Sequence, residues 1–288
     1  MSLSQGQVSK DTAIDETAAP LFAKDDLRLR PCRHGVMLYS LHDIYIGRSL
    51  EVYGQYAEDE AELYQQLLKP GQVAVEAGAN IGAHTVVLAQ AVGPQGLVVA
   101  AEPQRIVYQL LCANLALNNL KNVQARICGF GAERGSLRVP PRDYDRDGNF
   151  GAVTLQADGP GELVPVQPID ALGLPQCHLI KVDVEGMEQA VLEGARDTIT
   201  THRPALYVEN NKRDQSPSLI SMLQDLDYRL WWHIPRLYRE DNLRGHAVDI
   251  FDNTININML GLPADDPRKV MFKEISGPAD WWKDEDDR

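Results

Sequence analysis

The chain has 288 residues, of which 44% are hydrophobic, so it can bury a sizeable core in one large α/β domain or in two smaller ones. Its formal net charge of −13 argues against a nucleic-acid or anionic-membrane surface, because both partners attract positive charge. Four scattered cysteines without zinc spacing favour a reducing compartment, and neither a signal-peptide core nor a membrane-spanning apolar run is present. The sequence therefore predicts a cytoplasmic protein that binds neither membranes nor nucleic acids.

The N-terminal part predicts a tail followed by a small cap. Residues 1 to about 24 are polar and unpatterned, which is typical of a mobile tail. Short β-like pieces lie between residues 27 and 56, and residues 58–68 have the pattern of a helix with an acidic start. We expect residues 1–60 to form the tail and a β/α cap, and residues 61–288 to form the main domain.

The rest of the chain alternates between predicted strands and helices. Apolar runs predict strands at residues 71–79, 96–103, 123–132, 178–186 and 204–211, with helices at residues 81–92, 104–120, 187–200 and 216–227. Nearly continuous apolar strands, each followed by a helix, predict a parallel sheet with helices on both faces. Residues 138–168 read as irregular. Residues 228–235 and 254–260 alternate like an antiparallel pair. They are separated by a long loop (about 235–254), which we expect to lie at the acceptor site, where the second substrate of the reaction binds.

A glycine-containing turn follows the first strand of this alternation. Gly78, Asn80 and Gly82 occupy alternate positions, and glycine lets backbone N–H groups approach a ligand closely. Glu102 ends the next strand, where a carboxylate can accept two hydrogen bonds from a ribose diol. The turn alone is also compatible with a tight connection that binds nothing, but the two features together predict a nucleoside cofactor.

The residues of the turn distinguish between cofactors. A dinucleotide fingerprint needs G-x-G-x-x-G, whereas Asn80 and Ala83 stand in place of its second and third glycines. Glu76, just before the turn, suits a positively charged amino group better than a pyrophosphate. S-adenosylmethionine carries a ribose, an ammonium and a sulfonium but no phosphate. We therefore expect this cofactor, with a nicotinamide dinucleotide as the alternative.

Four motifs resemble the FkbM family of S-adenosylmethionine-dependent methyltransferases: VEAGANIGAHT, VVAAEPQ, LIKVDVEGMEQAVLEGA and ALYVENN. The resemblance covers about residues 43–263. It implies a class I methyltransferase fold, an α/β, Rossmann-like sheet of seven strands, mostly parallel with an antiparallel last strand. It also implies a methyltransferase that mostly O-methylates hydroxyls of secondary metabolites or saccharides. By position, it implies that the cofactor is bound by Tyr53, Tyr56, Glu76, Gly78, Asn80, Gly82, Glu102 and Asp183.

Within this resemblance the residues have separate roles. The turn residues border the methionine part, Glu102 holds the ribose, and Asp183 lies near the sulfonium. Tyr53 and Tyr56 cover the cofactor. The third-strand region, ICGFGAERG, is a loose version of the family pattern, so the adenine contacts stay open.

Polar side chains at the ends of two neighbouring predicted strands could form a metal site. Asp183 ends one predicted strand, and Glu209 and Asn210 end the next. Three oxygen ligands on adjacent strand ends suit a hard divalent cation such as Mg²⁺, which would ease deprotonation of an acceptor hydroxyl. The alternative is that Glu209 and Asn210 only hydrogen-bond loops or the acceptor.

Removal of the hydroxyl proton needs a base, and histidine is best poised for this at neutral pH. His233, at the end of a predicted strand, is the preferred catalytic base alongside Asp183, with His246 in the loop behind it, whereas His84 packs within the first helix. Trp231 and Trp232 could offer a stacking wall, although alternation places one of them in the core. The acidic C-terminal tail carries no predicted chemistry, and its Trp281 and Trp282 fold back.

The sequence as a whole predicts a methyltransferase that moves a methyl group from S-adenosylmethionine to a hydroxyl of a small metabolite or saccharide. Two alternatives are a nicotinamide-dependent oxidoreductase and a noncatalytic cofactor-binding module. The sequence does not predict the oligomeric state.

Overall fold

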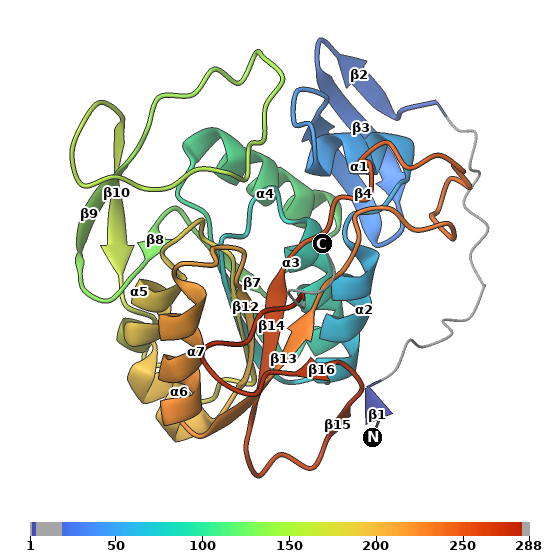
Figure 1. Ribbon diagram of the computed structural model, residues 1–288. Coiled ribbons are helices and arrows are strands. Elements are labelled where there is room, and N and C mark those ends of the chain that lie inside the picture. Colours follow the sequence, from blue (N-terminus) through green and yellow to red (C-terminus); the bar gives the residue numbers. More distant parts are fainter. Residues whose placement is uncertain (1, 4–18, 284–288) are drawn as a thin grey trace.

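A sheet of eight strands forms the centre of the computed structural model, which describes residues 2–3 and 19–283 (Figure 1). The strand order is β16 (Lys273–Glu274), β13 (Tyr228–His233), β14 (Asn258–Pro263), β12 (Ala205–Glu209), β11 (Leu179–Val182), β5 (Val73–Ala77), β6 (Leu97–Ala101) and β7 (Val123–Arg126). The strands from β12 to β7 pair in parallel, whereas β14 is antiparallel to both of its neighbours. The predicted α/β, Rossmann-like fold is confirmed, and β16 adds an eighth strand beyond the seven expected.

The strands form because nearly all of their side chains can be buried. Every residue of β5 is buried, and its side chains alternate between two separate cores, with Ala74 on one face of the sheet and Val75 on the other. The central strands are therefore covered on both sides. Their carboxyl ends remain free at one edge, where the polar residues of the candidate site follow.

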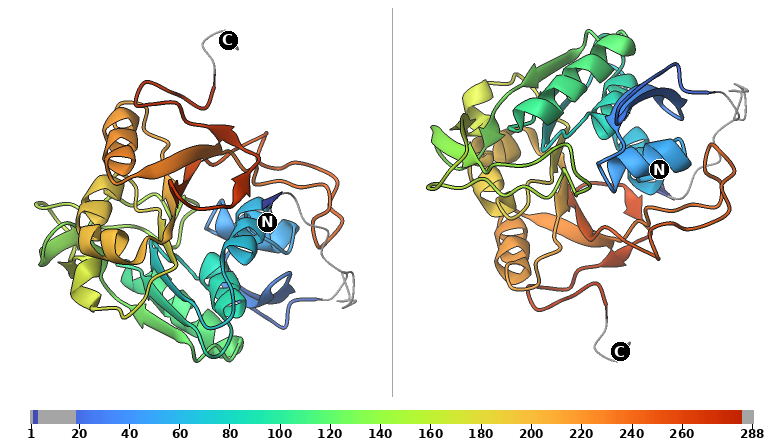
Figure 2. Two further views of the ribbon diagram at one scale, coloured as in Figure 1. Left: turned by 90° about the horizontal axis from the view of Figure 1, so that it is seen from below. Right: turned by 90° about the horizontal axis from the view of Figure 1, so that it is seen from above.

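Two groups of helices supply these cores. The first comprises α2 (Glu58–Leu67), α3 (Ala83–Val92) and α4 (Arg105–Leu117), and the second comprises α5 (Glu188–Glu193), α6 (Arg196–His202) and α7 (Ser216–Asp225). Figure 2 shows the yellow-to-orange second group on the opposite side of the sheet from the blue-to-green first group. The helix predicted at residues 187–200 is divided into two helices at Gly194, which packs against the backbone of Gly131. A Cβ on Gly194 would lie 2.0 Å from the carbonyl oxygen of Gly131.

The N-terminal segment packs on the first group of helices. Its strands β2 (Phe22–Lys24), β3 (Leu27–Cys32) and β4 (Gly35–Ser40) form an antiparallel sheet, followed by α1 (Ile46–Val52). Met37 of this segment shares a core with Val86 of α3 and Val107 of α4. The predicted boundary at residue 60 falls inside α2. Most of the predicted tail lies outside the described residues.

The stretch predicted to be irregular is partly regular. It contains β10 (Glu162–Gln167) and overlaps only the end of β9 (Gly135–Val139). Both strands join β8 (Gly129–Phe130) in a small separate sheet, before a 3₁₀ helix at Ile169–Leu172. Proline and glycine in this stretch hid the strands from the sequence pattern.

At the C-terminal end, β14 begins four residues later than predicted, because residues 254–257 run along the candidate site before the strand starts. The short strand β15 (Lys269–Val270) pairs with β1 (Ser2–Leu3). Trp281 and Trp282 pack against the core, as predicted, whereas the last five residues lie outside the described part. Among the described residues, none of the helices has both the length and the apolar character needed to cross a membrane.

Candidate active site

A cavity of about 320 Å³ lies at the carboxyl ends of β5, β6, β11 and β12. This is the edge of a parallel sheet at which α/β proteins bind ligands, and small-molecule sites commonly measure roughly 300–1,000 Å³. Its lining combines strand-end carboxylates, aromatic side chains from the N-terminal segment, and residues 254–258, which lead into β14. Three stretches that are distant in the sequence therefore build one site.

The turn after β5 is closed by its own hydrogen bonds. Gly78, Asn80 and Gly82 all have positive φ angles, of 80°, 49° and 88°. All five N–H groups from Gly78 to Gly82 have acceptors within the protein, which are the carbonyl oxygens of Ala101 and Ala79 and the side chains of Glu102 and Asn80. The expectation that these groups face a ligand is therefore wrong.

The glycines of this turn serve the backbone and the packing. A Cβ on Gly78 would lie 1.8 Å from the carbonyl oxygen of Asp183, so the two chain segments touch directly. Gly78 and Asn80 still line the cavity, whereas Gly82 does not, because it faces α4, where a Cβ on Gly82 would lie 2.7 Å from the side chain of Leu111. Gly82 is thus a packing residue, and its predicted cofactor contact is wrong.

Glu102 is held in place by two backbone N–H groups. Its Oε2 accepts from Asn80 (3.0 Å) and its Oε1 from Gln104 (2.8 Å). Burial raises the pKa of Glu102 to about 7, although these two hydrogen bonds act in the opposite direction. A carboxylate has about four acceptor positions, so Glu102 can still accept from a ligand diol in the cavity that it lines.

Glu76 lies fully buried in the cavity wall. Its Oε2 accepts from the Thr85 hydroxyl (2.6 Å), whereas its Oε1 has no hydrogen-bond partner within the described structure. The nearest cation is Lys181, whose Nζ lies 3.7 Å from Glu76 Oε1 and 3.5 Å from Asp183 Oδ2. Burial raises the pKa of Glu76 to about 7, and Lys181 and Thr85 only partly offset this effect. Glu76 therefore presents an acceptor that a ligand donor could satisfy.

A second, smaller cavity of about 40 Å³ continues from the first. The two cavities share Gly78, Glu102 and Asp183. The smaller one is an apolar slot, lined by side chains that include Phe130, Val153, Leu155 and Met187. Glu102 thus stands between a polar cavity and an apolar slot.

One part of the rim of the larger cavity carries Asp183, Glu185 and Glu209. Burial, together with Asp183, raises the pKa of Glu185 to about 7, and burial with the same neighbouring charges raises the pKa of Glu209 far above its usual range. Asn211 donates to Glu209 Oε1 (2.8 Å), and Glu209 Oε2 has no partner among the described residues.

The predicted divalent-cation site does not assemble. Asn210 is buried and turned into the protein, where its amide donates to Ser216 Oγ (2.8 Å) and contacts Met259 Sδ. Within residues 2–3 and 19–283, no three histidine, cysteine, aspartate or glutamate side chains are grouped as metal ligands. Asn210 thus has the structural role that the alternative interpretation gave it.

Comparison with known proteins points to the same stretch of the chain. A family model described as the methyltransferase FkbM domain matches residues 76–230, which is more than half of the chain. The chain belongs to the FkbM methyltransferase family. The resemblance read from the sequence motifs is therefore confirmed.

Two individual methyltransferases match part of the chain at moderate sequence identity. "Methyltransferase 1" of Beauveria bassiana (strain ARSEF 2860) is 32% identical over 145 residues, covering 43% of this chain and 58% of the relative. "Methyltransferase sdnD" of Sordaria araneosa is 32% identical over 154 residues, covering 42% and 59%. The chain thus spans less than three-fifths of the length of these curated relatives. The crystal structure of methyltransferase FkbM from Methylobacillus flagellatus KT has a TM-score of 0.42 and 21% identity, over 75% of this chain and 53% of that one.

Two aromatic side chains predicted for this FkbM site lie away from it. His233 is buried behind Tyr207, whose hydroxyl is 2.7 Å from His233 Nδ1, and it does not line the cavity. Because it does not reach the cavity and contacts Tyr207, His233 is a structural imidazole and not the base, and burial lowers its pKa to about 4. Tyr53 is also buried, with its hydroxyl between Val248 and Ile250 of the C-terminal loop, whereas Tyr56 does line the cavity.

Of four further side chains considered for the site, three lie away from both cavities and one lies between them. Trp231 and Trp232 are both buried and line neither cavity, so the stacking wall is wrong. His246 contacts the ring of Tyr53 and also lies outside the cavity lining. Asp183, in contrast, lies at the junction of the two cavities.

Sequence reasoning missed a buried polar group around Glu60 of α2. Glu60 accepts from Tyr64 (2.9 Å), Asn256 (2.7 Å) and Asn258 (3.3 Å), and its Oε2 lies 4.0 Å from Nδ1 of His84. His84, Asn256 and Asn258 line the cavity. A polar side chain such as Glu60 in the apolar face of a helix was the available signal.

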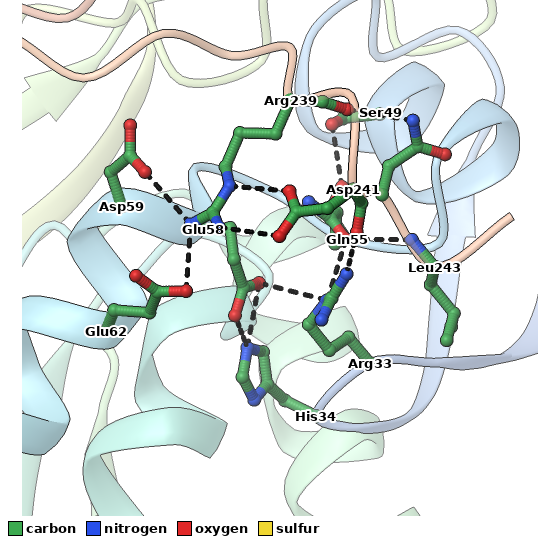
Figure 3. A network of polar contacts seen from close by, with 11 residues as sticks. Arg33, His34, Ser49, Gln55, Glu58, Asp59, Glu62, Arg239, Asp241 and Leu243 are labelled. Atoms are coloured by element: carbon green, nitrogen blue, oxygen red, sulfur yellow. Dashed lines mark hydrogen bonds and ion pairs between the residues drawn. The ribbon is translucent and has the colours of Figure 1, made fainter. Parts of the chain in front are cut away.

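A cover over the cavity is held by the network in Figure 3. Arg239, in the loop between β13 and β14, donates to Asp59 and Glu62 of α2 (both 2.9 Å) and to Asp241 (2.7 Å). Arg33 donates to Gln55, which also accepts from the N–H of Leu243. This network, the cover latch, ties residues 234–257 to α2 and to the N-terminal segment.

Proposed function

We propose that this FkbM-family chain is an S-adenosylmethionine-dependent O-methyltransferase that acts on a hydroxyl of a small metabolite or saccharide. The observation that supports it most strongly is the buried Oε1 of Glu76, which accepts no hydrogen bond and has only an ion pair with Lys181, in a cavity that continues past Glu102 into an apolar slot. This arrangement suits a nucleoside with a cationic arm.

The residues present fit the cofactor. Glu102 would accept from its ribose diol, and the slot at Phe130 and Met187 would receive its flat adenine ring. Glu76 would receive its ammonium. When bound, the cofactor supplies an electrophilic methyl group on a sulfonium, and the excess of carboxylates over Lys181 at this site favours such a positive charge.

The closed turn argues against a dinucleotide. A pyrophosphate is normally bound by free N–H groups at the start of the helix that follows the first strand. Here the five N–H groups from Gly78 to Gly82 are already bonded within the protein. A pyrophosphate would therefore lack its usual donors at this turn.

The chain's own residues would contribute mainly by positioning. Tyr45, Tyr56 and Leu237 shape the entrance, and Asn149, Asn211 and Asn256 supply donors and acceptors for hydroxyls. Asp183, which is half exposed at the cavity junction, is the carboxylate that we place beside the transferred methyl group to take the hydroxyl proton.

The same proposal places the enzyme in the cytoplasm without a nucleic-acid partner. All four cysteines are unpaired, which suits a reducing compartment, and the net charge of −13 favours a small acceptor over a polyanion.

The deciding experiment is calorimetric titration of the purified protein with S-adenosylhomocysteine and, separately, with NADH. Binding of the first and not the second is expected. Turnover is then tested with methyl-labelled S-adenosylmethionine and a panel of phenols and glycosides, with mass spectrometry of the products. Binding of NADH alone would contradict the proposal, and labelled methyl found only on nitrogen would contradict the O-methylation.

A further inference from the structure

The wall of the larger cavity contains a buried histidine with an unused ring nitrogen. His84 lies in the first turns of α3, and its side chain is 8% exposed. It lines the cavity, and its Nε2 has no hydrogen-bond partner among the described residues. A buried polar atom without a partner is destabilising, so a ligand that supplied a hydrogen-bond donor would remove this penalty.

The neighbours of His84 hold its ring and favour one tautomer. The ring packs between Tyr56 and Tyr64, with centroids 5.4 Å and 5.3 Å away. Its Nδ1 faces Glu60 Oε2 at 4.0 Å, and Tyr64 and Asn256 hold that carboxylate in place. A carboxylate on this side favours the proton on Nδ1, which leaves Nε2 as an acceptor.

The charges around His84 indicate what kind of hydrogen-bond donor fits beside it. Glu60 and Glu76 are both buried beside the cavity, and Lys181 is the cation nearest to them. Burial and the charge of Lys181 hold the pKa of His84 well below its usual range, so the ring is neutral and adds no positive charge. Two acceptors without a hydrogen bond, one of them at ion-pair distance from Lys181, lie in negatively charged surroundings that suit a cation with several N–H donors, such as a primary ammonium.

We propose that His84 Nε2 and Glu76 Oε1 together bind the α-ammonium at the amino-acid end of the cofactor, with Glu60 as the positioning residue for His84. The inference rests on the proposed function. Glu102 and the apolar slot would hold the nucleoside on one side of Gly78, so the amino-acid end extends to the other side, toward Glu76 and His84.

The test compares two ligands that differ in this end. S-adenosylhomocysteine carries the ammonium, whereas methylthioadenosine keeps the nucleoside and sulfur without the amino acid. His84→Phe keeps the packed ring and removes the acceptor. It should weaken S-adenosylhomocysteine binding about tenfold, the effect of one lost hydrogen bond, and leave methylthioadenosine binding unchanged. His84→Gln, whose amide oxygen can accept, should restore part of the affinity.

The matched control is His178→Phe, at the opposite end of β11, where His178 lines neither cavity. It should change neither affinity. Equal affinity of His84→Phe and wild type for S-adenosylhomocysteine would overturn the inference while the proposed function stands. Equal weakening of both ligands would also overturn it, because the ring would then only shape the site. A wild-type protein that binds neither ligand would refute the proposed function itself.

A second measurement does not depend on a variant that folds. Nitrogen NMR of the wild-type histidine side chains should show His84 Nε2 unprotonated, with a resonance that moves on addition of S-adenosylhomocysteine and not of methylthioadenosine. A resonance that S-adenosylhomocysteine leaves unmoved, or a proton on Nε2 in the free protein, would overturn the assignment.

Discussion

The carbonyl oxygen of Asp183 occupies the space that a side chain on Gly78 would need, since a Cβ there would lie 1.8 Å from it. The backbone at the end of β11 therefore touches the turn after β5, and Lys181 of β11 also donates to the Gly78 carbonyl oxygen (3.4 Å). This contact holds the two strand ends together at the point where the two cavities meet.

Gly78→Ala should accordingly lower the free energy of unfolding. Gly71 offers a matched control, because its φ of 86° resembles the φ of 80° at Gly78, while no atom lies within 4 Å of its Cβ position. Both variants strain the backbone, but only Gly78→Ala adds the overlap, which should cost a further amount of about 1–3 kcal/mol. Denaturant unfolding measures the difference, and equal losses would contradict the contact.

Glu102 should matter for folding as well as for binding. Glu102→Ala leaves the N–H groups of Asn80 and Gln104 without their acceptor, so we expect a loss of about 1–3 kcal/mol of stability in addition to weaker S-adenosylhomocysteine binding. Glu162→Ala, which removes an exposed ion pair with Arg105, is the control and should change stability little. An unaltered unfolding midpoint for Glu102→Ala would refute this dual role.

Ligand affinity should depend on pH through Glu76. Its pKa is raised to about 7 in the free protein, and a bound ammonium favours the ionised carboxylate. Affinity for S-adenosylhomocysteine should therefore be greatest above about pH 7 and fall as the pH drops toward about 5, with proton release on binding. Calorimetry in two buffers of different ionisation enthalpy measures this release. The slope should be smaller in Glu76→Gln, and an identical slope would exclude Glu76 as the titrating group.

His233 should affect acid stability and not ligand binding. Its pKa is lowered from 6.5 to about 4, so its contribution to stability is complete above about pH 6.5 and is lost as the pH falls toward 4. The full effect is about 3 kcal/mol at most. His233→Phe should remove this part of the pH dependence in unfolding experiments and leave S-adenosylhomocysteine affinity within about twofold. A large loss of affinity would return His233 to the binding site.

The cover latch should control how residues 234–257 exchange amide hydrogens. Arg239→Gln removes contacts to Asp59, Glu62 and Asp241, and we expect faster exchange in this loop. Arg236→Gln is the control, since its exposed side chain contacts Asn253 in the same loop. Exchange that is equally slow in both variants would show that apolar packing alone holds the cover.

The parts of the fold that could be predicted are those whose signal is local. β5 and β11 are short apolar runs, and the positions of Glu76, Glu102 and Asp183 follow from the ends of such strands. The strands β9 and β10 were missed because they are short and partly exposed, and because β9 begins at a glycine and β10 contains a proline.

The parts of the site that could not be predicted depend on contacts between distant segments. Alternation puts His233 on one face of its strand, but only the packed structure shows that Tyr207 stands between it and the cavity. Likewise, His84 faces the cavity because Glu60 and Tyr64 of α2 hold its other side. A spacing rule contains no information about either arrangement.

The lining of the larger cavity has a consequence for how new specificities can arise. Its strand-end side, which includes Glu76 and Glu209, lies inside the stretch of the FkbM domain match, whereas Tyr45 and Tyr56 precede that stretch and Asn256 and Asn258 follow it. The two flanking segments are joined to each other by Arg239. Exchanging both flanks between family members as a matched pair would replace the outer wall of the cavity and leave its strand-end side unchanged. Exchanging one flank alone would separate Arg239 from its carboxylate partners.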